Sequence, residues 1–502
     1  MKTRGPTLLC AGLVSALAVF AFTPFARADS RDGEFEEMRA MMKEMAKTIK
    51  TLQAEVAELK YEKAARKEGA PPARVANAAQ TTAPASKPSS QLSSSSTEVL
   101  SNPAPGIADT RYRNTFLDEQ WPAPRVNNAP IDPSLKGFFP IPGTSTIFKI
   151  GGSARIDAIV DDSNNGNPNE FIPSSFPVPG QPHAGTPSRS QVEAKGTRIN
   201  FELRRPMGED NNLRIYYEND FFGDSSSSTM TYRVRHLYAQ AWNVLVGQTF
   251  SNFEDIDAFP DVVNYHGPSS LINVRQPQLR YTQPFLDTRL QLAVSAEQPD
   301  SQIKTDNPVY GKNASPVNRI PDLTAHVRFV DKRFGHLQLA GIYRYLAFDN
   351  DNTGRGVPGW GVSLSGEIHL FAHDSLTAQA TYGHGIARYI QDPQGQNEDA
   401  ALDDHGNLRA LPVWGVGVGY THEWRDKWRS TISYGHANVA TEKSNGQFAF
   451  DHSNYVSANL VYLWSPTFRL GLEYLYGTNQ VRNGASHDGQ RLNFVLRYDL
   501  VK

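Results

Sequence analysis

Arginine recurs at alternate positions of several segments in the C-terminal part of the chain, where the intervening residues are apolar. In residues 148–160, Ile150 and Ile156 share one face of an extended chain, and Arg155 and Asp157 share the other. A guanidinium group keeps its charge in a narrow space, and rings of such groups attract anions. The spacing therefore predicts a basic inner surface that acts by electrostatics, not a centre for covalent chemistry.

Eight arginines form the candidate set that would line a pore and contact a solute. They are Arg155, Arg198, Arg204, Arg214, Arg235, Arg275, Arg280 and Arg328. Arginine outnumbers acid on these polar faces, which favours a positive lumen. The alternative for any single arginine is a structural ion pair with a neighbouring acid. Arg235 and Arg275 lie in segments that alternate poorly, so an outward direction also stays open for them.

One connection carries a cluster of acids. Residues 251–273 follow the fifth predicted strand, and we expect them to form a constriction loop. The acids are Glu254, Asp255, Asp257 and Asp261. Facing the basic wall, they would create a transverse field and oppose simple anion selectivity. The alternative is an ordinary external loop.

Catalytic motifs are absent from the sequence. It contains no G-x-S-x-G, no P-loop and no H-E-x-x-H. His369, His373 and His384 are not spaced with acids as metal ligands would be. We therefore expect a protein that is not an enzyme and that needs no metal or other cofactor. A net charge of -2 gives no field that would favour nucleic acid.

The arginines must be positioned by strands, because the polar and apolar residues alternate with a period of two. Clear alternation marks 148–160, 198–204, 213–218, 289–296, 322–329, 362–370, 468–476 and 491–500. Weaker alternation marks 232–241, 242–250, 274–283, 336–346, 375–389, 413–424, 427–437 and 455–464. The total of about sixteen strands suits a porin-sized barrel.

The fold predicted from this pattern is all-β, a transmembrane antiparallel barrel. Its apolar face would meet lipid, and its polar face would line the lumen. The strands are too numerous for one soluble sandwich, and Trp242, Trp424 and Trp464 fall near strand ends, as in an interface girdle. Beyond the N-terminal apolar segment, no stretch reaches the roughly 18 apolar residues of a membrane helix.

Four regions follow one another along the chain. Residues 1–28 read as a signal peptide, with Ala26-Arg27-Ala28 as cleavage site and the only cysteine, Cys10, inside it. Residues 29–63 are predicted to form a periplasmic coiled-coil helix, residues 64–134 a flexible Ala/Pro/Ser-rich linker, and residues 135–502 the outer-membrane barrel. The heptad seam consists of Phe35, Met38, Met42, Met45, Ile49, Leu52, Val56 and Leu59.

Several blocks resemble the DcaP-like family of outer-membrane porins. They are Lys136–Thr144, Phe148–Gly152, Phe171–Ser175, Arg235–Tyr238, Gly247–Phe253 and Arg275–Thr282. The resemblance covers nearly the whole predicted mature chain. It implies a sixteen-stranded homotrimeric barrel in outer-membrane lipid that passes small anionic organic solutes.

Two other function classes remain open on the sequence. An outer-membrane barrel enzyme would need a serine or acid dyad at a strand end, and no such set stands out. A structural tether that links the outer membrane to the cell wall would use residues 29–134, and it could coexist with a pore.

Overall fold

The structure is a computed structural model, and it describes the C-terminal part of the chain. The described residues are 115–501, with gaps at 133, 208–210, 305–314, 351–352, 372 and 426. The predicted signal peptide (1–28), the predicted coiled coil (29–63) and residues 64–114 of the predicted linker lie outside the described residues.

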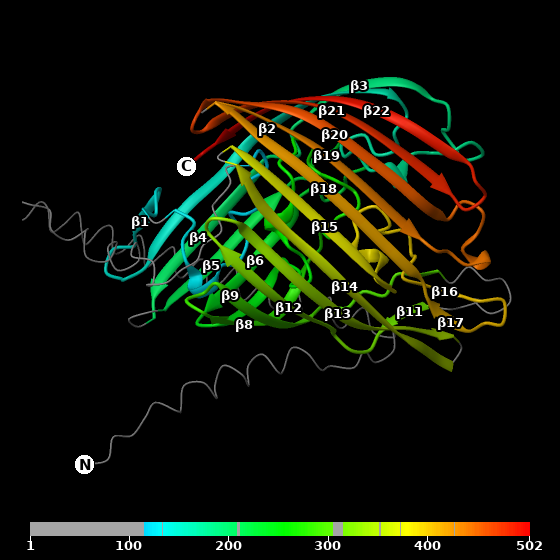
Figure 1. Ribbon diagram of the computed structural model, residues 1–502, viewed down its shortest axis with the longest axis horizontal. Helices are drawn as coiled ribbons and strands as arrows, with labels where there is room; N and C mark the ends of the chain where they lie inside the picture. Colours follow the sequence, from blue (N-terminus) through cyan, green and yellow to red (C-terminus); the bar gives the residue numbers. More distant parts are fainter. Residues whose placement is uncertain are drawn as a thin grey trace, which may run out of the picture. The chain divides into compact units, whose positions relative to one another are not determined.

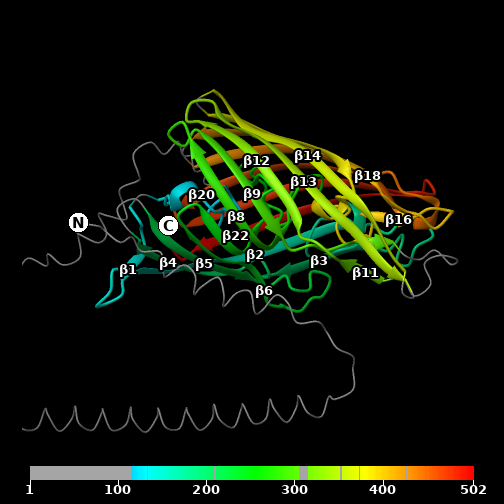
Figure 2. The ribbon, with the colours of Figure 1, turned by 90° about the horizontal axis from the view of Figure 1, so that it is seen from below.

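Sixteen strands of the described residues form a closed antiparallel barrel (Figure 1; Figure 2). In chain order these wall strands are β2 (Ile147–Ser163), β4 (Arg198–Pro206), β5 (Asn212–Asp220), β6 (Arg233–Ala241), β7 (Val244–Phe250), β8 (Arg275–Phe285), β9 (Leu290–Glu297), β12 (Asp322–Asp331), β13 (Gly335–Asn350), β14 (Thr353–Phe371), β15 (Asp374–His384), β18 (Pro412–Arg425), β19 (Trp428–Val439), β20 (Phe450–Ser465), β21 (Phe468–Val481) and β22 (Ser486–Asp499).

Each wall strand pairs with the next wall strand along the chain, and the last pairs with the first. Arg491–Asp499 of β22 runs antiparallel to Ser153–Asp161 of β2. Closure leaves no unpaired edge, so the backbone groups of the wall are satisfied by the ladder itself.

The two ends of the barrel differ. At one end the connections are tight, as at Trp242-Asn243 between β6 and β7; we call this the turn end, and the C-terminus lies there (Figure 1). At the other, the loop end, the longest connections are 164–186, 221–232, 251–274, 298–321, 385–411 and 440–449.

The remaining elements are short. β1 (Phe138–Pro140) and β3 (Pro187–Glu193) pair with β2, and β11 (Ser315–Asn318) pairs with β13. A small separate sheet consists of β10 (Ile303–Lys304), β16 (Ala400–Leu402) and β17 (Leu408–Ala410). The 3-10 turns are η1 (Val126–Asn128), η2 (Pro173–Ser175), η3 (Ile256–Ala258), η4 (Ala387–Tyr389) and η5 (Lys443–Asn445). Among the described residues no helix is long and apolar enough to cross a bilayer.

Apolar side chains of the wall face outward and polar side chains face the interior, as expected of a membrane barrel. In β2, Arg155 and Asp157 are 1% and 2% exposed, while Ile156 and Val160 are 47% and 51% exposed. The exposed fraction thus belongs to the apolar residues, which reverses the arrangement of a soluble barrel. Four exposed tryptophans, Trp242, Trp424, Trp428 and Trp464, lie at the turn end, where the rings of Trp428 and Tyr462 lie 4.4 Å apart, and Trp414 lies at the loop end.

The fold class predicted from the sequence is confirmed, and each of the sixteen predicted segments overlaps one wall strand. The short elements β1, β3 and β11 were not predicted. They have three to seven residues, too few for an alternation to stand out.

Candidate functional site

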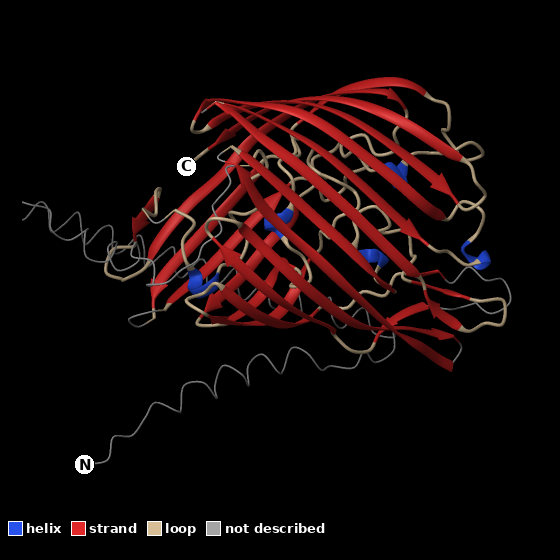
Figure 3. Cartoon of the chain, viewed as in Figure 1, coloured by secondary structure: helices blue, strands red, loops and turns tan. Residues whose placement is uncertain are grey.

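The barrel interior is crossed by residues 251–274, which we call the lumen loop. The loop leaves β7 and returns to β8, yet it reaches strands on the far side of the barrel. The N–H of Val263 donates to Glu473 of β21 over 3.1 Å, and Arg155 of β2 donates to the carbonyl of Val263 over 2.8 Å. Figure 3 shows irregular chain running through the space that the strands enclose.

Glycines on the inner face of β18 make room for this loop. A methyl group on Gly415 would lie 2.5 Å from the Ser270 carbonyl oxygen, and one on Gly417 would lie 2.5 Å from Leu271. Gly419 has the same relation to Pro260 of the loop. Since these three glycines are consecutive inward positions, they form a strip on which the loop rests, and any larger side chain would displace it.

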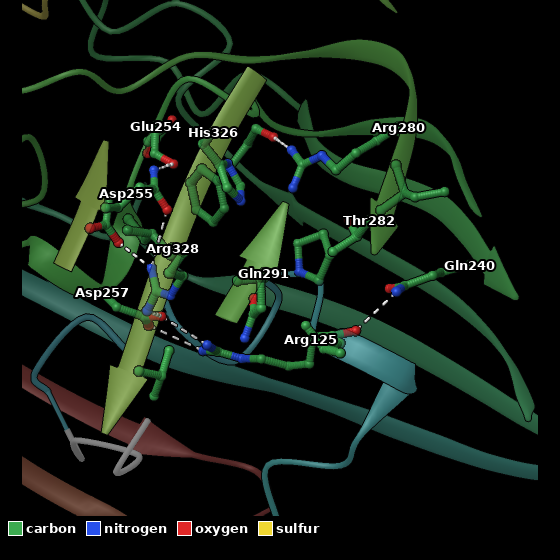
Figure 4. Close-up of a pocket in the computed structure, with 18 of the residues that line it drawn as sticks. Arg125, Gln240, Glu254, Asp255, Asp257, Arg280, Thr282, Gln291, His326 and Arg328 are labelled. Atoms are coloured by element: carbon green, nitrogen blue, oxygen red, sulfur yellow. Dashed lines mark hydrogen bonds and ion pairs between the residues drawn. The ribbon is translucent and has the colours of Figure 1, made fainter. Parts of the chain in front are cut away.

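The acids predicted for a constriction loop pair with the wall (Figure 4). Asp255 accepts hydrogen bonds from Arg328 over 2.7 Å and from Ser365 over 2.8 Å, and it lies 2.9 Å from His336. Asp257 accepts from Arg328 over 2.6 Å. These two acids therefore join the loop to strands β12, β13 and β14.

The other two acids have different partners. Asp261 pairs with Arg429 of β19 and accepts a hydrogen bond from the N–H of Phe116 over 2.6 Å. Glu254 accepts from the N–H of Val274 within the loop over 2.9 Å. Burial raises the pKa of Glu254 well above its usual range, which disfavours a negative charge there.

A second piece of chain also lies inside the barrel. Residues 115–132, which we call the N-terminal insert, belong to the C-terminal end of the predicted linker (64–134), yet they pack against the inner wall. Tyr238 of β6 donates to the carbonyl of Pro122 over 2.7 Å, and Arg204 of β4 donates to the carbonyl of Asn128 over 2.6 Å. Phe116 is fully buried between the lumen loop and β21.

The insert places Glu119 among the predicted arginines. One carboxylate oxygen of Glu119 pairs with Arg198 of β4, and the other pairs with Arg235 of β6. Arg235 also pairs with Glu218 over 2.8 Å and with Asp220 over 3.2 Å. Burial alone would raise the pKa of Glu119, but the neighbouring arginines lower it to about 2. Glu119 is therefore an ionised carboxylate held by two guanidinium groups.

Three more of the predicted arginines are paired with acids of the wall. Arg204 and Arg214 each donate to one oxygen of Glu202 over 2.8 Å, and Arg155 donates to Asp157 over 2.6 Å. These pairs match the structural alternative that the sequence left open.

Arg275 and Arg280 differ from the other six. In the described part of the chain, neither has a carboxylate within 4 Å. Arg280 donates to Gln278 over 2.8 Å and to the carbonyl of Phe250 over 2.5 Å, and Arg275 lies 3.4 Å from Asn273. Their charges are therefore less neutralised than those of the paired arginines.

Each of these two arginines borders a cavity. A cavity of about 340 Å³ toward the loop end, the loop-side chamber, is lined by Glu119, Arg233, Arg235, His266 and Arg275. A cavity of about 100 Å³ toward the turn end, the turn-side chamber, is lined by Arg125, Asp257, Arg280, His326 and Arg328 (Figure 4). Arg125 of the insert pairs with Asp257 over 2.9 Å, so both pieces of inserted chain border the second cavity.

Sequence reasoning missed the insert residues Asp118, Glu119 and Arg125. A signal was present, because the Ala, Pro and Ser composition gives way near residue 110 to aromatic and charged residues such as Phe116 and Trp121. Within the described residues, no group of three or more His, Cys, Asp or Glu side chains is arranged to hold a metal ion.

A family model described as DcaP outer membrane protein matches residues 136–500. The chain has no significant match among curated protein sequences. Among solved structures, it is similar to the outer membrane channel DcaP of Acinetobacter baumannii, with 23% identity and a TM-score of 0.63 over 73% of this chain and 100% of that one.

A second structure is less similar. It is the anion-selective porin from Comamonas acidovorans, with 9% identity and a TM-score of 0.47 over 71% of this chain and 100% of that one. The N-terminal insert precedes the residues that the family model matches.

Proposed function

Since the chain belongs to the DcaP outer membrane protein family, we propose that it is a passive outer-membrane channel for small anionic organic solutes and not an enzyme. The observation that carries the proposal is the pair Arg275 and Arg280. Each borders a cavity inside the barrel, and neither has a carboxylate partner within 4 Å in the described chain. An unpaired guanidinium group between low-dielectric walls attracts anions and repels cations.

The proposal keeps all eight predicted arginines in the lining but assigns them different roles. Arg155, Arg198, Arg204, Arg214, Arg235 and Arg328 are paired with acids, so they mainly brace the interior. Arg275 and Arg280 carry the selectivity. The acids of the lumen loop oppose it weakly, because Asp255, Asp257 and Asp261 are paired and burial disfavours ionisation of Glu254.

The test is the zero-current potential across a planar bilayer under a salt gradient. At about 8 Å and an effective dielectric constant of about 20, one charge changes the energy of an ion by about 2 kcal/mol before salt screening. With screening, Arg280→Ala should lower the anion-to-cation permeability ratio by about fivefold. Arg289→Ala is the control, because Arg289 lies at the turn end, is half exposed and pairs with Asp331. A cation-selective wild type would refute the proposal.

We further propose a homotrimer with its turn end toward the periplasm. A strand needs about 9–11 residues to cross the hydrocarbon core, whereas β7 has 7 and β9 has 8. A neighbouring copy of the chain would cover the part of the wall that these short strands form. Migration of the unheated protein as a trimer on a denaturing gel would support the assembly, and a monomer under all mild conditions would contradict it.

The alternatives from the sequence carry less support. A tether through residues 29–134 can coexist with the channel. The predicted coiled coil at 29–63 lies outside the described residues.

We also propose that this coiled coil stabilises the oligomer. Deleting residues 34–63 should then lower the temperature at which the oligomer dissociates, and an unchanged temperature would exclude that role.

A further inference from the structure

The interior of this barrel binds a peptide segment chiefly through arginines. Arg214 donates to the carbonyls of Trp121 and Ala123, each over 3.2 Å, and Arg497 donates to the carbonyl of Phe116 over 2.7 Å. The acceptors are all oxygen atoms of the N-terminal insert. The surface that would attract an anionic solute is therefore already occupied in part by oxygen atoms of the protein's own chain.

Glu119 is the charged group at the loop-side chamber that the insert contributes. Both of its carboxylate oxygens are used, one by Arg198 and one by Arg235. Its side chain is 12% exposed and borders the loop-side chamber, so it is in contact with the cavity and not sealed behind the wall. A carboxylate that bridges two guanidinium groups is the arrangement that a bound carboxylate solute would adopt.

The lining of the loop-side chamber carries an excess of positive charge that carboxylates reduce. Three arginines, Arg233, Arg235 and Arg275, face two carboxylates, Glu119 and Glu170. The loss of the Glu119 charge would therefore make the local field more positive.

We propose that Glu119 is a selectivity-determining residue: it occupies the Arg198–Arg235 site as a resident carboxylate and limits how strongly the channel prefers anions. This inference rests on the proposed function, since selectivity requires a conducting channel. The insert precedes the family-matched residues, so the barrel and the limiting carboxylate come from separate parts of the chain.

The test is the zero-current potential of Glu119→Gln in planar bilayers, using potassium chloride gradients. The amide keeps the shape of the side chain and an oxygen acceptor but removes the charge. The anion-to-cation permeability ratio should rise severalfold. Asp132→Asn is the control, because it removes the same charge from the same insert at a residue that does not border the loop-side chamber. Equal shifts in the two variants, or none in Glu119→Gln, would overturn the inference.

A second measurement does not depend on selectivity. Cys10 is the only cysteine of the sequence and lies in the predicted signal peptide, so Glu119→Cys would give a mature chain with a single thiol. An anionic methanethiosulfonate reagent should then reduce the current, and should leave the wild type unchanged. Failure of the reagent to act on folded barrels would place residue 119 outside the ion path and overturn the inference.

The two proposals fail in different ways. A cation-selective wild type refutes the proposed function, yet a rise in relative anion permeability for Glu119→Gln would still support the role of Glu119. An anion-selective wild type with no effect at residue 119 leaves the proposed function intact and removes the further inference.

Discussion

The lumen loop rests partly on a strip of inward glycines, whereas the N-terminal insert lies against inward arginines that bind its backbone. Gly415, Gly417 and Gly419 face the loop, and the loop fits them by shape. Arg204 and Arg214 face the insert and bind its carbonyl oxygens. Both pieces of chain fill the interior and both form ion pairs with wall arginines, but the loop rests in addition on the glycine strip of β18.

This difference shows why inward arginines alone are a poor guide to solute contact. Six of the eight predicted arginines are paired with acids. The selectivity of such a wall depends on the few guanidinium groups that the protein itself does not neutralise. Variants of the N-terminal insert should therefore change pore size, whereas variants of the glycine strip under the lumen loop should change stability.

The largest effect is expected from replacing residues 115–132 with a Gly/Ser sequence of the same length. The new segment lacks the acids and aromatic side chains that hold the insert, so it should leave the lumen. Single-channel conductance should rise by about twofold or more, because both the cross-section and the free positive charge increase. Unchanged conductance would mean that the insert does not obstruct the ion path.

A smaller effect is expected from Gly417→Val on the strip that carries the lumen loop. The added side chain meets Leu271, and overpacking of this kind costs about 1–3 kcal/mol. The temperature at which the barrel loses its folded mobility on gels should fall. Gly341→Val is the control, since a methyl group there meets nothing closer than a carbonyl oxygen at 3.9 Å. An equal fall in both variants would contradict the role of the strip.

The smallest effect concerns pH and the connection 385–411, whose residue Gln391 donates through its N–H to the carbonyl of Leu271 in the lumen loop over 3.1 Å. Burial raises the pKa of Glu398 to about 8, although the N–H of Phe450 donates to it over 2.9 Å. The folded connection keeps a proton that an unfolded one releases above about pH 4.5. Its stability should therefore fall as pH rises from about 5 to about 8 and then level off.

Hydrogen exchange across residues 385–411, corrected for the intrinsic rate, would measure this effect. Protection should decrease between pH 6 and pH 8.5 in the wild type, but not in Glu398→Gln, which stays neutral. Lys304 favours ionisation of Glu398 and Asp451 opposes it, so their contributions partly cancel. Equal pH dependence in both proteins would assign it to another group.

The wall could be predicted from the sequence because its signal is local. A run such as 468–476 alternates over many residues, and each strand repeats the same rule. The acids of the lumen loop also stand out in the sequence, since they cluster after the fifth strand, and a constricting role for the loop stays a prediction. The partners of those acids could not be predicted, because Arg328 and Arg429 belong to strands whose register relative to the loop depends on closure of the whole barrel.

The insert could not be placed from the sequence for a different reason. Many of its contacts are made by carbonyl oxygens, which every residue has, and its acids Asp118 and Glu119 pair with arginines far along the chain. The change of composition near residue 110 marks a segment distinct from the linker, but it does not identify those partners. The glycine strip on β18 was visible as V-G-V-G letters, but glycine at inward positions predicts only that something approaches closely, not what does.

The strip on β18 also bears on the order of assembly. The lumen loop is made before the strands that receive it: Val263 binds Glu473, which lies 210 residues later in the chain. Contacts so distant in sequence form late, because the entropy of closing the intervening chain must first be overcome. The wall itself closes between β2 and β22, where Asp161 and Arg491 are 330 residues apart. The last strands therefore both close the wall and supply far partners of the loop, so the interior cannot be completed before the wall is nearly complete.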